Sequence, residues 1–223
     1  MLLSPGTRYI VDGVEHEISP TEEFIGSIPR FTPERQHFLE RLKGILRYFH
    51  ETCEKYSIKY YLSCGTLLGA LKVKGILPWD TDGDVSIPRS EVLKLKAAFM
   101  NGPYKLIPFR YGYKLAVTEF PYYPFVDLMI VDIDPRYPEP TYAFCYPLDS
   151  QDKPTFEMRL WFNKKKHPLS IIYPLRKYEF EGMELWGPAD GHEVCRLNYG
   201  EKCFTTSLAK HFRKHCISAW LRI

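Results

Sequence analysis

The feature that most constrains this chain is an acidic run at residues 79–85, which reads Trp-Asp-Thr-Asp-Gly-Asp-Val. Asp80, Asp82 and Asp84 occupy every second position, and the side chains of an extended strand alternate with a period of two. The run therefore predicts a strand with three carboxylates on one face. A bound divalent cation relieves the repulsion among such charges, and carboxylate oxygens favour Mg²⁺, Mn²⁺ or Ca²⁺. We interpret Asp80, Asp82 and Asp84 as metal ligands.

The segment before this run predicts a strand, a glycine turn and a short helix. Residues 60–62 read as the strand, Gly65 and Thr66 begin the turn, and residues 67–71 read as the helix. Glycine lets backbone approach a ligand closely, and the N–H groups at the start of a helix favour phosphate. We therefore expect Gly65 and Thr66 to bind a phosphate-bearing substrate beside the metal. Enzymes that transfer phosphoryl or nucleotidyl groups commonly combine a bound metal with a phosphate-binding turn.

These motifs resemble the LicD family, which includes fukutin and the fukutin-related protein and belongs to the nucleotidyltransferase-like superfamily. The matching stretch is Gly-Thr-Leu-Leu-Gly-Ala at residues 65–70, then Gly75, Pro78-Trp79-Asp80 and Asp82-x-Asp84, and weaker matches extend it over residues 56–205. The resemblance implies an α/β (α+β) nucleotidyltransferase-like fold, in which a small mixed sheet is flanked by helices.

The resemblance also implies an activity. Members of this family transfer a phospho-alcohol, such as phosphocholine or ribitol phosphate, from a CDP-linked donor to a glycan hydroxyl and release CMP. By this resemblance Asp82 and Asp84 bind Mg²⁺ or Mn²⁺ and take part in catalysis. The expected partners are therefore a CDP-alcohol of the CDP-choline or CDP-ribitol type and a glycan or glycoconjugate acceptor.

Asp127 is the further carboxylate that such a site needs to deprotonate or position the attacking hydroxyl. It lies in residues 125–132, which predict a strong strand that we expect beside the acidic one. In the superfamily this carboxylate comes from such a strand, so the resemblance implies Asp127. Asp132 stays an alternative, although an unbroken strand would place Asp127 and Asp132 on opposite faces. We interpret Asp134, which precedes Pro135, as a turn residue.

Two lysines are further candidates for binding the donor phosphates. Lys72 and Lys74 lie near the expected end of the short helix, and the alternative is that both are solvated. The family usually has a basic-His-Lys sequence where this chain has Val73 between the two lysines, and the chain also differs at Thr81 and Gly83. These differences leave a non-catalytic binding relative of the same fold as one alternative. A nucleotidyltransferase proper, which moves NMP and releases pyrophosphate, is another.

A calcium-binding loop competes with the transferase interpretation of the acidic run. Counted from Asp80, acids fall at positions one, three and five, and Glu91 falls at position twelve, as in an EF-hand. The sharp-turn glycine of that motif belongs at position six, where Val85 stands, and Pro88 lies inside the loop. We therefore favour the strand over the calcium loop.

The rest of the chain predicts an irregular N-terminal arm at residues 1–30, with a short strand at 8–11, followed by one domain at residues 31–223. Thr32, Pro33 and Glu34 predict the start of a helix that ends near Tyr56, because a capping residue, proline and an acid suit the first turn. Further elements are expected as helices at 91–99 and 192–197, strands at 104–106 and 113–117, and a loop at 137–154.

Charge and hydropathy limit the possible partners. The chain has 223 residues with 30 Lys and Arg against 27 Asp and Glu, so it lacks the strongly basic character of a nucleic-acid-binding protein. No stretch approaches the roughly twenty apolar residues that a membrane span needs, and residues 1–6 are too short for a signal core. The sequence therefore predicts no transmembrane segment and a cytoplasmic setting, whereas the resemblance implies the Golgi lumen if the N-terminus is incomplete.

Overall fold

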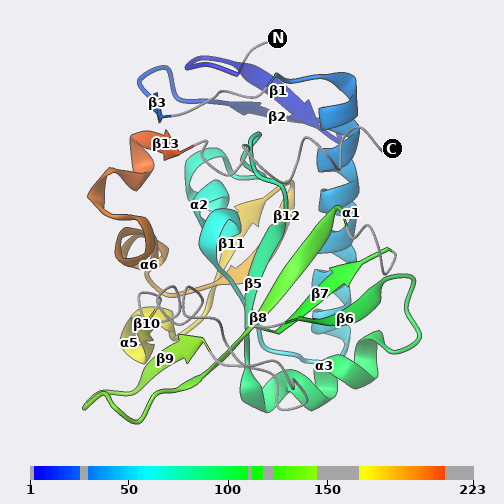
Figure 1. The fold of residues 1–223 in the computed structure, drawn as a ribbon, viewed down its shortest axis with the longest axis vertical. Helices are drawn as coiled ribbons and strands as arrows, with labels where there is room; N and C mark the ends of the chain where they lie inside the picture. The colour runs from blue at the N-terminus through cyan, green and yellow to red at the C-terminus, as the bar shows by residue number, and fades with distance from the viewer. Residues whose placement is uncertain (1–2, 26–29, 110–111, 118–122, 145–165, 209–223) are drawn as a thin grey trace.

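The computed structural model describes residues 3–25, 30–109, 112–117, 123–144 and 166–208 (Figure 1). Its centre is a seven-stranded mixed sheet. The strands of this sheet are β4 (Tyr61–Leu62), β5 (Gly83–Pro88), β6 (Lys105–Phe109), β7 (Gly112–Ala116), β8 (Phe125–Ile133), β9 (Thr141–Phe144) and β10 (Lys166–Pro168). The architecture is the α/β class with a mixed sheet and flanking helices that the sequence predicts.

Strand β8 organises the sheet. On one side it pairs in parallel with β5, and on the other it pairs antiparallel with β7 along its first half and with β9 along its second half. Strand β4 extends the sheet beyond β5, β6 beyond β7 and β10 beyond β9. The first seven residues of β8 are all buried. A strand covered on both faces is apolar almost throughout, so the buried Asp127 in its middle stands out.

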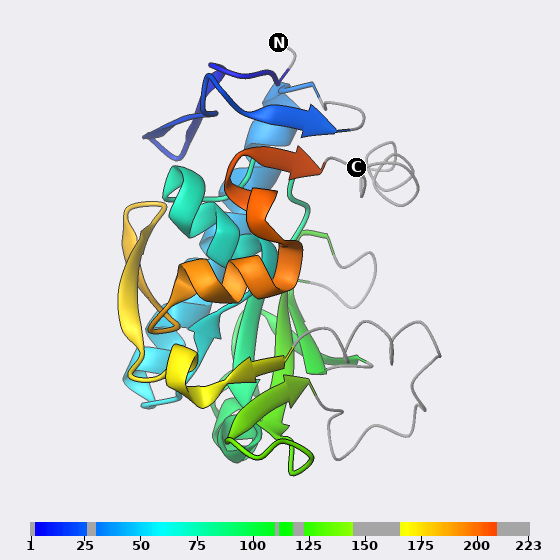
Figure 2. The same cartoon turned by 90° about the vertical axis from the view of Figure 1, so that its left-hand side faces the viewer.

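Helices cover the sheet. They are α1 (Pro33–Lys55), α2 (Cys64–Val73), the 3₁₀ turn η1 (Arg89–Glu91), α3 (Val92–Phe99), α5 (Leu169–Ile172), α6 (Gly191–Tyr199) and the 3₁₀ turn η2 (Glu201–Phe204). Helix α1 runs along the sheet and contacts β8, whereas α2 packs on β5 and beside α6 (Figures 1 and 2). Within the described ranges, none of these helices has the length and apolar character needed to cross a bilayer.

The predicted first helix is confirmed at both ends. Thr32 Oγ1 accepts a hydrogen bond from the backbone N–H of Arg35 at 3.2 Å, Pro33 is the first helical residue, and Tyr56 is the C-cap. This geometry satisfies one of the free N–H groups at the start of the helix. The apolar face of the helix then enters the core through Leu39, Leu42, Ile45, Leu46 and Phe49.

The N-terminal segment is more regular than the predicted arm. It contains the hairpin of β1 (Arg8–Val11) and β2 (Val14–Glu17), and β3 (Glu23–Ile25), which pairs in parallel with β13 (Thr206–Leu208). The hairpin turns through Asp12 and Gly13, both with positive φ. An Asp-Gly pair between short strands is a strong hairpin signal, and it could have predicted this turn. The boundary at residue 31 stays a prediction.

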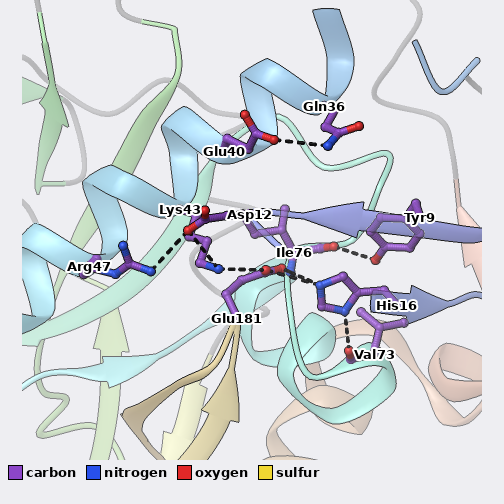
Figure 3. Close-up of polar contacts among 10 residues, drawn as sticks. All are labelled: Tyr9, Asp12, His16, Gln36, Glu40, Lys43, Arg47, Val73, Ile76 and Glu181. Carbon is purple, nitrogen blue, oxygen red and sulfur yellow. Dashed lines mark hydrogen bonds and ion pairs between the residues drawn. The ribbon is translucent and has the colours of Figure 1, made fainter. Parts of the chain in front are cut away.

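A buried ionic network fastens this hairpin to the rest of the molecule (Figure 3). His16 Nδ1 lies 2.9 Å from the Val73 carbonyl oxygen, and His16 Nε2 lies 3.1 Å from Glu181 Oε1. Glu181 Oε1 also accepts the N–H of Ile76 at 2.8 Å, and Glu181 Oε2 lies 3.9 Å from Lys43 Nζ. The carbonyl oxygen and the carboxylate both accept hydrogen bonds, and this arrangement favours the charged form of His16, in which both ring nitrogens are donors.

Two further regions differ from the predicted secondary structure. Strand β9 lies inside the predicted loop at 137–154, of which residues 145–154 are outside the described ranges. The hairpin of β11 (Arg176–Phe180) and β12 (Met183–Gly187) has no counterpart among the predicted elements. It turns through Glu181 and Gly182, both with positive φ, and a Glu-Gly pair is a weaker turn signal than Asn-Gly or Asp-Gly.

Candidate functional site

Three carboxylates meet where β5 and β8 run side by side. Asp84 of β5 is in register with Asp127 of β8, and Asp82 stands just before β5. One ligand oxygen from each of Asp82, Asp84 and Asp127 lies within 4.8 Å of the other two. The strand that carries Asp127 therefore lies beside the acidic segment, as expected.

The acidic run itself is not one continuous strand. Strand β5 begins at Gly83, and the Asp80 N–H closes a turn on the Leu77 carbonyl oxygen at 2.8 Å, so Asp80 and Asp82 lie in the connection before the strand. Because Pro78 starts a turn, the period of two does not apply to residues 80–82. The alternative EF-hand loop is not formed either, since residues 83–88 pair with β8 and β4.

The start of α2 holds Asp84 in place. The Gly65 N–H donates to Asp84 Oδ2 at 3.0 Å, and the Asp84 N–H donates to Thr66 Oγ1 at 2.7 Å. A Cβ on Gly65 would collide with the carboxylate of Asp80 and lie 3.3 Å from Asp84 Oδ2. Cys64 enters the helix with a φ of 43°, which is uncommon for a residue other than glycine. The described contacts of Gly65 and Thr66 are thus with the acidic residues, and their role toward a donor stays a prediction.

The carboxylates perturb one another. Burial, and then the neighbouring charges of Asp84, Asp80 and Asp127, raise the pKa of Asp82 well above its ordinary value, while Lys114 lowers it. Repulsion of this kind is what a bound cation relieves. Three carboxylate oxygens at this spacing are hard ligands of the type that Mg²⁺ and Mn²⁺ prefer. The side chains of Asp82, Asp84 and Asp127 therefore fit a divalent cation, and Asp80 stands beside them against Gly65.

Lys114 also belongs to the candidate site, although the sequence did not single it out. It lies on β7 in register with Asp127, and its Nζ is 2.6 Å from Asp127 Oδ1. Each of the two side chains is 7% exposed, so this is a buried ion pair. The signal in the sequence was a single lysine inside the buried strand Gly-Tyr-Lys-Leu-Ala. Its partner could be found only from the register between β7 and β8.

Two further residues support the site from other elements. Arg35, 1% exposed in the first turn of α1, donates through Nε to the Pro78 carbonyl oxygen at 2.8 Å and through Nη2 to the Asp80 carbonyl oxygen. Tyr199 of α6 is 39% exposed, yet burial of its hydroxyl, and then the charges of Cys64, Asp84 and Asp80, raise its pKa. Arg35 therefore shapes the turn before β5, and Tyr199 lies near the carboxylates.

The two alternative carboxylates have other partners. Arg89 Nε donates to Asp132 Oδ2 at 2.7 Å, and this pair is half-exposed. Arg136 binds both oxygens of Asp134, and these hydrogen bonds lower the pKa of Asp134 to about 2. These contacts favour Asp127 over Asp132 as the carboxylate of the site. The interpretation of Asp134 as a turn residue agrees with its hydrogen bond to the Arg136 N–H at 3.1 Å.

The two candidate lysines contact other parts of the molecule. Lys72 is buried, pairs with Glu22 and donates to Ser207 Oγ at 3.1 Å. Lys74 is exposed and lies 2.7 Å from Glu179 Oε2. Contact of either lysine with phosphate stays a prediction, and these partners do not favour it.

Comparison with known proteins gives relatives of limited overlap. The chain is 55% identical over 48 residues to the lipopolysaccharide cholinephosphotransferase LicD of Haemophilus influenzae, which is 22% of this chain and 18% of that protein. It is 26% identical over 149 residues to the uncharacterized protein RP689 of Rickettsia prowazekii, covering 67% of this chain and 50% of that one. The chain thus spans half or less of the length of these curated relatives.

Among solved structures, the lincomycin-bound lincosamide antibiotic adenylyltransferase LnuA is similar with a TM-score of 0.38 and 12% identity, over 71% of this chain and 97% of that one.

The family model described as "LicD/FKTN/FKRP, nucleotidyltransferase domain" matches residues 57–190, which is more than half of the chain. That stretch contains α2, β5, β7 and β8, and with them the three carboxylates and Lys114. The chain belongs to the LicD/FKTN/FKRP nucleotidyltransferase domain family.

Proposed function

We propose that the chain is a metal-dependent phosphotransferase that moves a phospho-alcohol from a CDP-linked donor to a glycan hydroxyl and releases CMP. The observation that carries this proposal is the convergence of Asp82, Asp84 and Asp127 at the start of α2, within a domain of the LicD family. The Haemophilus relative, whose name describes a cholinephosphotransferase, supports phosphocholine as the first candidate for the transferred group. Ribitol phosphate is the second candidate.

In this reaction the acceptor oxygen forms a bond to the phosphorus of the phospho-alcohol, and the bond from that phosphorus to the oxygen of the CMP leaving group breaks. Asp82 and Asp84 would hold Mg²⁺ or Mn²⁺ beside Asp127, and Asp80 would be a further ligand or contact the ligands from outside. When bound, the cation neutralises charge on the donor phosphates and on the leaving CMP. Asp127 receives or orients the proton of the acceptor hydroxyl.

Gly65 and Thr66 would lie under the donor pyrophosphate. Both residues stand at the start of α2, where backbone N–H groups and the helix dipole favour an anion. The Gly65 N–H binds Asp84 in the described structure. We therefore expect the helix start to act on the donor mainly by keeping Asp84 and Asp80 in position.

The test is a screen for CMP release. Purified chain is incubated with CDP-choline, CDP-ribitol or CDP-glycerol and a glycan acceptor, in Mg²⁺, in Mn²⁺ or in EDTA. We expect CMP to form from at least one donor, to require the metal and to be lost in Asp84→Asn. Pyrophosphate release from an NTP would instead indicate a nucleotidyltransferase proper. A chain that binds CDP but releases nothing from any donor would be a non-catalytic relative.

A further inference from the structure

Three neighbouring strands place charged side chains in one row across the sheet. Asp84 of β5 is in register with Asp127 of β8, and Asp127 is in register with Lys114 of β7. Residues directly opposite each other on paired strands project to the same face. Two carboxylates, those of Asp84 and Asp127, are thus followed across the sheet by the ammonium of Lys114. The ammonium borders the cluster on the side of β7.

The ammonium is held firmly in this place. Lys114 Nζ lies 2.6 Å from Asp127 Oδ1, 3.5 Å from the ring centroid of Phe125 and 4.5 Å from that of Phe109. Phe125 stands two residues before Asp127 on β8, so both side chains lie on the same face. A cation over an aromatic face away from water gains further attraction. Lys114 is thus fixed by a charge and by two rings.

This position is one that a second metal would need. In two-metal transfer sites the ions lie about 3.5–4 Å apart and share carboxylate ligands. Here the carboxylate of Asp127 has two neighbours. It belongs to the cluster with Asp82 and Asp84, and it also binds the ammonium of Lys114. A divalent ion placed at Asp127 Oδ1 would meet a fixed positive charge at hydrogen-bond distance.

We propose that Lys114 is a positioning residue that serves as the permanent second cation of the site. It aligns Asp127 and limits the carboxylate cluster to a single divalent ion. This inference rests on the proposed metal dependence, but it makes a separate claim about how many ions bind.

The first experiment counts ions without any donor. Mn²⁺ is titrated into the metal-free chain by calorimetry and by electron paramagnetic resonance, alone and with CDP present. We expect one Mn²⁺ per chain under both conditions. Two ions per chain would overturn the role of Lys114 and leave the proposed function standing. No binding under either condition would overturn the metal-dependent function and this inference with it.

The second experiment removes the ammonium. Lys114→Met keeps an unbranched apolar chain as long as the lysine stem and removes the ammonium. Lys105→Met is the matched control, because Lys105 is exposed on the adjacent strand β6. We expect Lys114→Met to bind a second Mn²⁺, or to bind the first at least ten-fold more tightly, whereas Lys105→Met behaves as the parent. With Mn²⁺ saturating, kcat should fall in Lys114→Met while KM for the donor changes little, because Asp127 loses its alignment.

Lys114→Met leaves a buried carboxylate without its ammonium, so its metal-free form is expected to be less stable. The double variant Lys114→Met with Asp127→Asn removes both charges and keeps the proposal testable. We expect its metal-free melting temperature to recover toward that of the parent. A folded Lys114→Met that binds one Mn²⁺ with the parent affinity would show that the lysine is only structural.

Discussion

Asp82 carries an electrostatic cost in the folded chain. Its pKa is raised by burial and by Asp84, Asp80 and Asp127. An acid with a raised pKa in the folded state destabilises that state as the pH rises from the ordinary value, 3.8, through the raised one. The metal-free chain therefore carries a penalty at neutral pH, which a bound divalent cation would relieve.

We predict that Asp82→Asn loses activity while its metal-free form becomes more stable. The amide keeps the shape of the side chain but removes one charge from a hard-cation site, so we expect the rate of CMP release to fall about 10²-fold or more. The free energy of unfolding at pH 7, measured in urea with EDTA, should rise. Asp132→Asn, in a half-exposed pair with Arg89, is the control. Parent turnover by Asp82→Asn in saturating Mg²⁺ would contradict the metal assignment.

The second residue-scale prediction separates two roles of Asp127. If Asp127 acts on the acceptor hydroxyl, Asp127→Asn lowers the transfer rate by about 10²–10⁴-fold and leaves metal affinity nearly unchanged. If it is mainly a metal ligand, rate and Mg²⁺ affinity fall together. Both are measured from the Mg²⁺ dependence of initial rates, beside Asp132→Asn. An active Asp127→Asn with an inactive Asp132→Asn would show that the wrong carboxylate was chosen.

At the scale of single elements, the start of α2 and the strand β5 work as one unit. Gly65 and Thr66 bind the carboxylate and the N–H of Asp84, and Arg35 of α1 holds the turn before β5 through two backbone oxygens. Hydrogen bonds from a charged guanidinium each contribute about 1.5–3 kcal/mol. Groups from two helices therefore position the acidic segment: the Gly65 N–H and the Thr66 hydroxyl of α2, and the Arg35 guanidinium of α1.

We predict that Gly65→Val weakens donor binding in a chain that still folds. The added side chain collides with the carboxylate of Asp80 and crowds that of Asp84, so it displaces the groups that we propose hold the metal and position the donor. Calorimetry of CDP binding in Mg²⁺ measures the effect. Gly44→Ala is the matched control, because a Cβ there meets nothing nearer than the Tyr104 hydroxyl at 3.9 Å. That variant should gain roughly 1 kcal/mol of helix stability. Unchanged CDP affinity in folded Gly65→Val would place the nucleotide elsewhere.

Local chemistry in the sequence predicted those elements that depend on neighbouring residues alone. Thr32 and Pro33 predicted the start of α1, and the apolar residues around Asp127 predicted β8. The position of Lys114 could not be predicted, because it depends on the register of β7 against β8, which is set by the whole sheet. The strand assignment of residues 80–82 was wrong because the turn at Pro78 overrides the alternation of the carboxylates.

At the scale of the whole molecule, the N-terminal hairpin is joined to distant segments through His16. Burial lowers the pKa of His16, but its hydrogen bond to Glu181, the charge of Glu181 and its hydrogen bond to Val73 outweigh burial and raise the pKa overall. The network forms hydrogen bonds with the backbone of Val73 and Ile76, in the segment that leads from α2 toward the acidic residues. The hairpin therefore supports the connection that carries Asp80 and Asp82.

We predict that this support depends on pH. A histidine whose pKa is raised on folding contributes stability that is complete below its unfolded value of about 6.5 and is lost as the pH rises through the folded value. The difference in the free energy of unfolding between the parent and His16→Gln should thus be largest below about pH 6 and shrink as the pH rises through the folded pKa. Urea unfolding at a series of pH values tests this. A difference that stays constant or grows with pH would mean that His16 is not an imidazolium.

The pairing of β3 with β13 also has a consequence for how the chain is made. Glu22, just before β3, and Ser207, in β13, meet although 185 residues separate them, and Lys72 binds both. A ribosome adds about 5–20 residues per second, so roughly ten to forty seconds pass between the synthesis of the two strands. Throughout that interval β3 lacks the strand with which it pairs in the finished fold. Strand β3 is thus completed only after β13 has left the ribosome, and until then it is an unpaired strand open to chaperones and proteases.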